Sequence, residues 1–126
     1  MDSRPVILIA DDEPAATRLV VRSLTAEGFN VATARDGREA IERVWDLNPD
    51  LLLLDDQMPE LSGLDVLREL RATHPVRIIL MSGQDAVTKV TEALDLGADD
   101  VVSKPFAAPE LAARIRAVLR RRWHLL

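Results

Sequence analysis

Two pairs of adjacent aspartates stand at the ends of two strongly apolar runs. The pairs are Asp11-Asp12, after Val6–Ala10, and Asp55-Asp56, after Leu51–Leu54. Such runs are typical of buried strands, and carboxylates beside a core are costly because burial disfavours their charge. A divalent cation relieves that cost. Carboxylate oxygens suit Mg²⁺, which keeps several waters and binds one or two protein carboxylates together with a phosphate oxygen. The two pairs therefore indicate phosphate chemistry at a magnesium site.

The elements that must position these residues alternate between strand and helix along the chain. The candidate strands are Val6–Ala10, Asn30–Ala34, Asp50–Leu54, Arg77–Met81 and Asp99–Ser103. The segments with apolar residues at helical spacing are Pro14–Ala26, a stretch after Asp36, Gly63–Ala72, Ala86–Leu96 and a stretch from about Pro109. Several strands are near-continuous apolar runs, as expected of strands buried on both faces. Repeated strand–helix units imply right-handed crossovers and predict an α/β fold with a doubly wound, five-stranded parallel sheet.

Local signals indicate where the helices begin and which side chains face inward. Asp36 and Glu39 predict a capping box, in which Asp36 caps the helix and Glu39 reaches back to it. Ser62 and Asp85 are the predicted caps of the third and fourth helices. The apolar positions of the helical stripes include Leu19, Trp45, Leu64 and Leu94.

In sheets of this kind, ligands bind beyond the carboxyl ends of the strands. The first and third predicted strands end at the two aspartate pairs, the fourth ends at Ser82, and the fifth ends at Lys104. If the strands are parallel, these groups converge on one edge of the sheet. Side chains alternate along a strand, so only one of Asp55 and Asp56 faces the site.

Taken singly, each of these residues has an ordinary structural explanation. Aspartates before a helix suit its dipole, most lysines are solvated, and a Ser-Gly pair is common in turns. Taken together, they fit phosphoryl transfer. A carboxylate attacks phosphorus and becomes an aspartyl phosphate, Mg²⁺ screens the repulsion between carboxylate and phosphoryl oxygens, and a lysine and a hydroxyl stabilise the added charge.

The composition excludes several other kinds of site. The 126 residues are 48% hydrophobic and 29% charged, as in an ordinary globular domain. The net charge of −5 argues against a nucleic-acid-binding surface. The chain has no cysteine for disulfides or thiolate metal sites, and His74 and His124 are too far apart to suggest a histidine site. We expect a cytoplasmic protein, because neither a membrane-length apolar run nor a signal peptide is present.

A series of motifs gives the chain a resemblance to a known family. The motifs are Ala10-Asp11-Asp12-Glu13, Asp55-Asp56-Gln57-Met58-Pro59 with Ser62-Gly63, Met81-Ser82-Gly83, Gly97-Ala98-Asp99-Asp100 and Lys104-Pro105-Phe106. In order and spacing they resemble those of receiver domains, the phosphoacceptor modules of bacterial two-component response regulators. The resemblance spans about residues 4–121. We therefore expect a single receiver domain over residues 1–126, with residues 122–126 as a tail or the start of a linker.

The resemblance implies a flavodoxin-like (βα)5 fold with strand order 2-1-3-4-5. It implies a signalling module in which Asp55 accepts a phosphoryl group from a sensor histidine kinase, and which catalyses only its own phosphorylation and dephosphorylation. The implied Mg²⁺ ligands are Asp11, Asp12, Asp55 and the backbone carbonyl of Gln57. Ser82 and Lys104 are the other implied catalytic residues, and the bond between Lys104 and Pro105 is expected to be cis.

The resemblance also concerns regulation and partners. Val101 stands where receiver domains usually carry an aromatic residue, and Asp56 is charged where many relatives are apolar. The last helix resembles that of receivers in winged-helix transcription factors, which implies a homodimer promoted by phosphorylation. The expected dimer residues are Asp99, Asp100, Glu110, Arg114, Arg116 and Arg121. Val90 replaces an arginine expected in the fourth helix of that subgroup.

Two other interpretations use the same residues. A Mg²⁺-dependent phosphohydrolase would also need clustered aspartates and a lysine, although this chain has no insert for a cap or a substrate pocket. The second interpretation is an interaction module that is never phosphorylated. For the arginines of the last helix, the alternative to a dimer surface is an ordinary solvated helix face. We expect no membrane contact, and contact with nucleic acid only through an effector domain absent from this chain.

Overall fold

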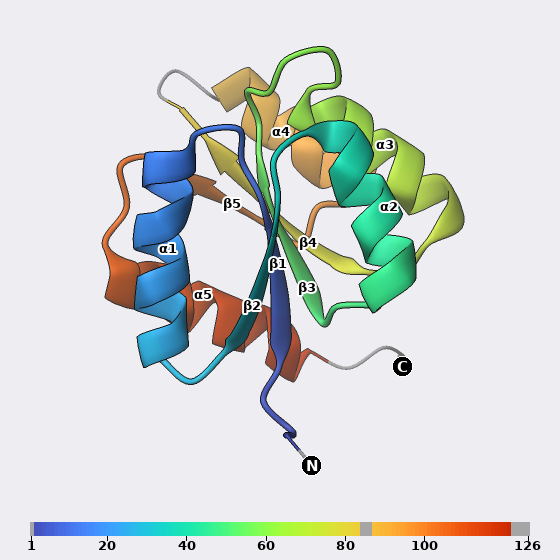
Figure 1. Ribbon diagram of the computed structural model, residues 1–126. Coiled ribbons are helices and arrows are strands. Elements are labelled where there is room, and N and C mark those ends of the chain that lie inside the picture. Colours follow the sequence, from blue (N-terminus) through green and yellow to red (C-terminus); the bar gives the residue numbers. More distant parts are fainter. Residues whose placement is uncertain (1, 84–86, 122–126) are drawn as a thin grey trace.

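The computed structural model describes residues 2–83 and 87–121, in which strands and helices alternate (Figure 1). The elements are β1 (Val6–Ala10), α1 (Pro14–Ala26), β2 (Asn30–Ala34), α2 (Gly37–Leu47), β3 (Leu51–Asp55), α3 (Gly63–Thr73), β4 (Arg77–Ser82), α4 (Val87–Leu96), β5 (Asp100–Ser103) and α5 (Ala108–Arg120). The strand limits agree with the predicted ones to within one residue at each end. The predicted cap Asp85 and the predicted tail, residues 122–126, lie outside the described residues.

The strands form one 5-stranded sheet in the order β2-β1-β3-β4-β5, and every neighbouring pair is parallel. This confirms the predicted fold and strand order. In Figure 1, α1 and α5 cover one face of the sheet, and α2, α3 and α4 cover the other. Because the strands run in the same direction, the carboxyl ends of β1, β3, β4 and β5 lie along one edge. The strand order reverses between β1 and β3, which makes this edge the expected place for a ligand.

Successive residues of the central strands point into two separate hydrophobic layers. In β3, Leu52 and Leu54 belong to the layer under α2 and α3, whereas Leu51 and Leu53 belong to the layer under α1 and α5. All of them are fully buried. Burial on both faces explains why this strand reads as an unbroken apolar run. Each fully buried leucine contributes roughly 1.5–3 kcal/mol, so β3 is firmly held and Asp55 at its end has a defined position.

Side-chain caps hold the starts of α2 and α3. Ser62 Oγ accepts from the backbone N–H of Asp65, and Asp65 Oδ2 accepts from the backbone N–H of Ser62, both at 3.2 Å, which completes a capping box. Asp36 caps α2 by accepting from the N–H of Glu39 at 2.8 Å. The capping box also predicted that Glu39 accepts from the N–H of Asp36. This is wrong by one residue, because Glu39 Oε1 accepts from the N–H of Arg35 at 2.8 Å.

The helices are amphipathic, and some apolar residues predicted to face inward lie outside. Trp45 is 53% exposed and Leu94 is 47% exposed, although their neighbours Val44 and Ala93 are fully buried. Successive helical residues are about 100° apart, so the residue after a buried one lies at the margin of the apolar stripe. Leu19 of α1 is 66% exposed and lies next to the half-buried Val20. Within the described part of the chain, no helix has the length and apolarity needed to cross a membrane.

Candidate functional site

The carboxyl edge of the sheet brings three aspartates together. Asp11 follows β1 and Asp55 ends β3, and the register pairs Ala10 with Leu54, so the two carboxylates extend from neighbouring strands. Ligand oxygens of Asp11, Asp12 and Asp55 all lie within 4.8 Å of one another. Asp11 and Asp55 are buried, whereas Asp12 is exposed.

Lys104 supplies positive charge at the same edge. Its Nζ donates a hydrogen bond of 2.9 Å to Asp55 Oδ1 and lies 3.9 Å from Asp11 Oδ2. Lys104 follows β5, where its backbone N–H donates to the carbonyl of Ser82 at 2.7 Å, and its peptide bond to Pro105 is cis, as predicted. The ammonium group therefore reaches from the end of β5 across β4 to the aspartates of β1 and β3.

Ser82 and Gln57 lie on the segments next to Asp55. Ser82 is the buried last residue of β4, one position beyond Met81, which pairs with Asp55. Its hydroxyl donates a long hydrogen bond of 3.4 Å to the carbonyl of Gly83. The backbone N–H of Gln57 donates to the Asp55 carboxylate. The structure thus joins Gln57 to Asp55 through its N–H, and metal binding by its carbonyl stays a prediction.

Comparison with known proteins identifies the family. The family model of the response regulator receiver domain matches residues 7–116. This chain belongs to the receiver domains of response regulators. As a receiver domain, it is a module of two-component signalling, and its family is not a classic enzyme family. The match therefore favours the receiver interpretation over the phosphohydrolase interpretation.

Curated relatives and solved structures agree with this assignment. The receiver domain is 43% identical over 122 residues to the probable transcriptional regulatory protein TcrX of Mycobacterium tuberculosis, covering 95% of this chain and 52% of that protein. It is 47% identical over 116 residues to the response regulator MprA of Mycobacterium leprae, covering 91% of this chain and 51% of that protein. The chain thus spans about half the length of the curated relatives it matches.

The solved structures show the same fold over nearly the whole chain. The receiver domain of the Francisella response regulator 1452 superposes with a TM-score of 0.89 at 30% identity, covering 94% of this chain and 98% of that one. The receiver domain of NtrX from Brucella abortus gives a TM-score of 0.87 at 32% identity, covering 92% of this chain and 99% of that one.

Burial and charge act in opposite directions on the central groups of the receiver domain. Burial raises the pKa of Asp55 above its ordinary value, although the hydrogen bond and the charge of Lys104 offset part of the increase. Burial alone would lower the pKa of Lys104, but the hydrogen bond and the charge of Asp55 outweigh it, so the pKa is raised. Lys104 is therefore charged at neutral pH, and additional positive charge would favour the ionised form of Asp55.

The donor set of the aspartate cluster fits Mg²⁺. Asp11, Asp12 and Asp55 offer carboxylate oxygens, which are the hard ligands that Mg²⁺ prefers. Three carboxylates face a single lysine in the described part of the cluster, so the ionised cluster carries excess negative charge. A divalent cation would cancel that excess, while the exposed side of Asp12 leaves room for waters or a phosphate oxygen.

Asp56 faces away from this cluster, as the alternation of side chains along a strand predicts. Its Oδ2 lies 2.5 Å from Nζ of Lys89 in α4. Sequence reasoning missed the role of Lys89. The available signal was the buried position expected for Asp56, because a buried carboxylate requires a nearby cation, and Lys89 lies in the helix that follows the neighbouring strand.

A hollow of about 540 Å³ opens beside the cluster, between α1 and the loop that leads from β5 to α5. Asp11 and Lys104 stand at its polar end, and Leu19 and Phe106 contribute to its apolar wall. Leu19 is therefore exposed to the hollow, where it lies beside other apolar side chains. The hollow thus extends from the cluster along α1.

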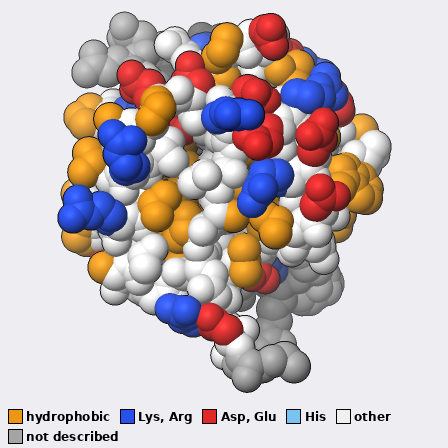
Figure 2. Space-filling view, viewed as in Figure 1, with side chains coloured by type: hydrophobic (Ala, Val, Ile, Leu, Met, Phe, Trp, Pro, Cys, Tyr) orange, Lys and Arg blue, Asp and Glu red, His pale blue; other side chains and the backbone are white. Residues whose placement is uncertain are grey.

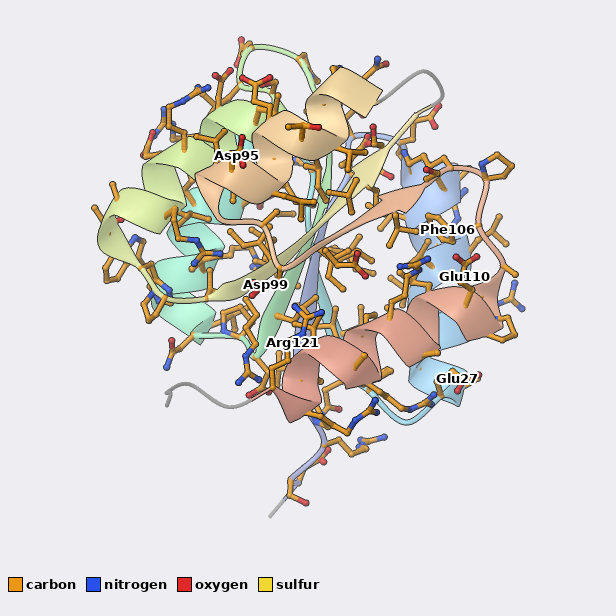
Figure 3. The ribbon with its side chains drawn as sticks, turned by 180° about the vertical axis from the view of Figure 1, so that it is seen from behind. Glu27, Asp95, Asp99, Phe106, Glu110 and Arg121 are labelled. Atoms are coloured by element: carbon orange, nitrogen blue, oxygen red, sulfur yellow. The ribbon has the colours of Figure 1, made fainter. Side chains whose placement is uncertain are left out.

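The residues predicted for a dimer lie in two different places. Figure 3 shows the face formed by α4, β5 and α5, with Asp99, Glu110 and Arg121 on it and Glu27 apart from it, near the end of α1. The bonds on this face join Arg114 to Asp100 and Glu110, each at 3.1 Å, and Arg121 Nη1 to the carbonyl of Asp99 at 2.8 Å. Arg116 instead pairs with Glu27 at 2.5 Å. It is thus directed away from the other members of the predicted set.

The opposite side of the molecule has an ordinary mixed surface. Figure 2 shows acidic and basic side chains intermixed over the face formed by α1, β2 and α2, with apolar side chains between them. A nucleic-acid-binding face would carry a basic stripe. On this face the basic side chains of the described residues are interspersed with acidic ones rather than aligned in a stripe (Figure 2).

Proposed function

We propose that this receiver domain accepts a phosphoryl group on Asp55 from a sensor histidine kinase in the cytoplasm, with Mg²⁺ held by Asp11, Asp12, Asp55 and the Gln57 carbonyl. The main support is the environment of the Asp55 side chain, which is 8% exposed, accepts a hydrogen bond from Lys104 and adjoins two further carboxylates. A buried carboxylate with a lysine partner and room for a divalent cation is suited to attack on phosphorus.

The chain's own residues divide the reaction between them. An oxygen of Asp55 forms a bond to phosphorus while the bond from phosphorus to the donor's imidazole nitrogen breaks, and that nitrogen keeps the electron pair. Lys104 is placed to donate to an oxygen of the arriving phosphoryl group, since it already reaches Asp55 at 2.9 Å. The hydroxyl of Ser82 can turn from its long bond with Gly83 to donate a second one. When bound, Mg²⁺ would screen the repulsion between the carboxylates and the phosphoryl oxygens.

Intact-protein mass spectrometry after incubation with a small acyl phosphate and Mg²⁺ tests this proposal. Wild type should gain one phosphoryl group, and Asp55→Asn should gain none, because the variant lacks the nucleophilic carboxylate. Asp56→Asn is the matched control, since it alters the adjacent aspartate that faces the other way. Uptake by Asp55→Asn at the wild-type level would assign the chemistry to another residue.

We also propose that phosphorylation promotes a symmetric dimer through the face formed by α4, β5 and α5. The support is the arrangement of Asp100, Glu110 and Arg114 within one face, where an acidic patch and a basic patch can exchange partners across a twofold axis. Such exposed pairs contribute little individually and are screened by salt. Any contact with nucleic acid would belong to an effector region outside these residues, since the curated relatives are longer.

Light scattering on the phosphorylated domain at low and high salt tests the dimer. Association should be weak at low salt and weaker at high salt, and Arg114→Ala should reduce it. Arg116→Ala is the matched control, because Arg116 pairs with Glu27 away from this face. A monomer at both salt concentrations would contradict the proposal.

A further inference from the structure

Each aspartate at the end of β3 has a lysine of its own. Asp55 accepts from Lys104 at 2.9 Å, and Asp56 pairs with Lys89 at 2.5 Å. The function proposed above uses the first pair and leaves the second without a role. The Asp56 side chain is only 3% exposed, so its charge is held in a site where an unpaired carboxylate would be costly.

The backbone of Asp56 is fixed on both sides. Its N–H donates to the carbonyl of Met81 in β4 at 2.9 Å, and its carbonyl accepts from the N–H of Gly63 at the start of α3 at 2.9 Å. A Cβ atom on Gly63 would lie 2.5 Å from the carbonyl oxygen of Asp55, so only glycine permits this close approach. The carboxylate of Asp56 therefore projects from a rigid junction of β3, β4 and α3.

Lys89 connects this junction to the first turns of α4. The helix begins at Val87, and the fully buried Ala93 lies one turn beyond Lys89. The Lys89 side chain is 43% exposed, so one side of it remains in solvent while its ammonium group contacts Asp56. The ion pair thus extends the attachment of α4 from Ala93 toward the start of the helix.

The pair also borders the candidate phosphorylation site. Lys89 and Asp56 line a hollow of about 580 Å³ together with Asp12 of the aspartate cluster. A phosphoryl group on Asp55 would carry roughly 1.5–2 negative charges in place of the single charge of the carboxylate, one residue away from Asp56. The new charge would attract the same ammonium group that Asp56 holds, and the exposed side of Lys89 leaves it free to respond.

We propose that the Asp56–Lys89 ion pair is a latch that holds the first turns of α4 against the end of β3 and is loosened when a phosphoryl group on Asp55 competes for Lys89. The release step rests on the phosphorylation proposed above, whereas the holding step does not. Asp56 and Lys89 are positioning residues in this scheme, and neither takes part in the transfer of the phosphoryl group.

Hydrogen exchange of peptides that cover α4, followed by mass spectrometry with and without acyl phosphate and Mg²⁺, separates the two steps. Without phosphorylation, exchange in the first turns of α4 should be roughly tenfold faster in Asp56→Asn and in Lys89→Met than in wild type, because each variant breaks a partly buried ion pair. Phosphorylation should accelerate exchange there in wild type and add little in either variant. Both variants should still take up one phosphoryl group, because neither residue takes part in its transfer.

Two further variants sharpen the test. Glu92→Gln is the matched control, since it removes an exposed ion pair between the same helix and Arg68 of α3 at 3.7 Å, and it should leave exchange as in wild type. Asp56→Leu combined with Lys89→Met replaces the pair by apolar contact. This double variant should keep α4 protected yet show no acceleration on phosphorylation, because a methionine offers no charge for the phosphoryl group to attract.

The outcomes of the exchange experiment separate the latch from the phosphorylation proposal. Wild-type exchange of α4 in both Asp56→Asn and Lys89→Met would overturn the latch, and so would an equal acceleration in Glu92→Gln. Failure of wild type to take up a phosphoryl group would instead contradict the function proposed for Asp55. In that case the unphosphorylated variants would still decide whether the pair holds α4.

Discussion

Carboxylates stand at both ends of the parallel sheet, but their partners differ in kind. At the amino ends of the strands, Asp50 precedes β3 and Asp99 precedes β5. Asp50 Oδ2 accepts from the backbone N–H of Val6 at 2.7 Å, and Asp99 Oδ2 accepts from the backbone N–H of Ile78 at 2.8 Å. These two aspartates complete the hydrogen bonding of neighbouring strands, and backbone N–H groups are their hydrogen-bond donors, although Arg71 also lies 3.6 Å from Asp99.

At the carboxyl ends, Asp11 and Asp55 accept from backbone N–H groups of the following loops, Glu13 and Gln57, but the aspartates also contact lysines. Asp11 and Asp55 lie next to each other, and Lys104 contacts both, while Asp56 has Lys89. A parallel sheet presents free N–H groups where its strands begin and free carbonyls where they end. Carbonyls cannot donate to a carboxylate. The same residue type therefore stabilises the fold at one edge of the sheet and creates a demand for positive charge at the other, which suits that edge to metal and phosphate chemistry.

The largest expected difference between the two edges is their response to Mg²⁺. Thermal or urea unfolding of wild type should show stabilisation of about 2.7 kcal/mol when Mg²⁺ is present at a hundred times its dissociation constant. Asp12→Asn at the carboxyl edge should lose most of this shift, because it removes one carboxylate of the cluster. Asp50→Asn at the amino edge should keep it. An equal shift in all three proteins would remove Asp12 from the metal site.

Removal of the carboxylate at the amino end of β5 should affect stability without affecting the chemistry. Asp99→Ala leaves the N–H of the fully buried Ile78 without its acceptor and Arg71 without a carboxylate 3.6 Å away. The expected loss is about 1–3 kcal/mol of unfolding free energy in urea titrations. Phosphoryl uptake from acyl phosphate should continue. A stable Asp99→Ala variant that cannot be phosphorylated would contradict the division between the edges.

Asp50 should give a smaller loss of the same kind. Its bond to Val6 lies at an exposed position, where water can replace the lost acceptor. Asp50→Ala should therefore cost about 0.5–1 kcal/mol in the same urea titration. Asp50→Asn keeps an acceptor oxygen and should lie closer to wild type. A loss as large as that of Asp99→Ala would show that exposure does not moderate these strand-end bonds.

The smallest expected effect is the pH dependence contributed by Asp55. Its pKa in the folded domain is raised above 3.8, chiefly by burial, so the folded state binds the proton more tightly than the unfolded state. The stability from this group is present below 3.8 and is lost as the pH rises through the folded pKa. Without Mg²⁺, wild type should lose more stability than Asp55→Asn between acidic and neutral pH, as measured by urea unfolding. Because Lys104 offsets part of the shift, the difference should be modest, and a steeper loss in Asp55→Asn would contradict it.

Features that depend on local periodicity were predictable from the sequence. The apolar run Leu51–Leu54 indicated a strand buried on both faces, and the alternation of side chains along that strand was enough to separate Asp55 from Asp56. The placement of Asp11, Asp12, Asp55 and Lys104 followed from one further inference, that the strands are parallel. Their chemical roles stay predictions until the phosphorylation and metal experiments are done.

The placement of Arg116 with the other expected dimer residues did not allow for the geometry of a helix. Glu110 and Arg114 share one face of α5, and Arg121 directly follows the helix, but Arg116 stands two positions after Arg114 and pairs with Glu27 instead. Positions three or four apart share a helix face, and positions two apart do not. Spacing alone could have separated Arg116 from the set.

By itself, the sequence determined the order of the elements, the edge at which the aspartates gather and the family to which the chain belongs. These follow from periodicity and motif spacing, which act within short stretches of chain. Only the tertiary structure decided which cation each buried carboxylate meets. Asp56 finds Lys89 because α4 packs beside α3 near the end of β3, and Asp99 finds the N–H of Ile78 because β4 and β5 pair in a particular register. Such pairings depend on how distant segments pack, where differences of a few ångströms separate an ion pair from a solvated side chain.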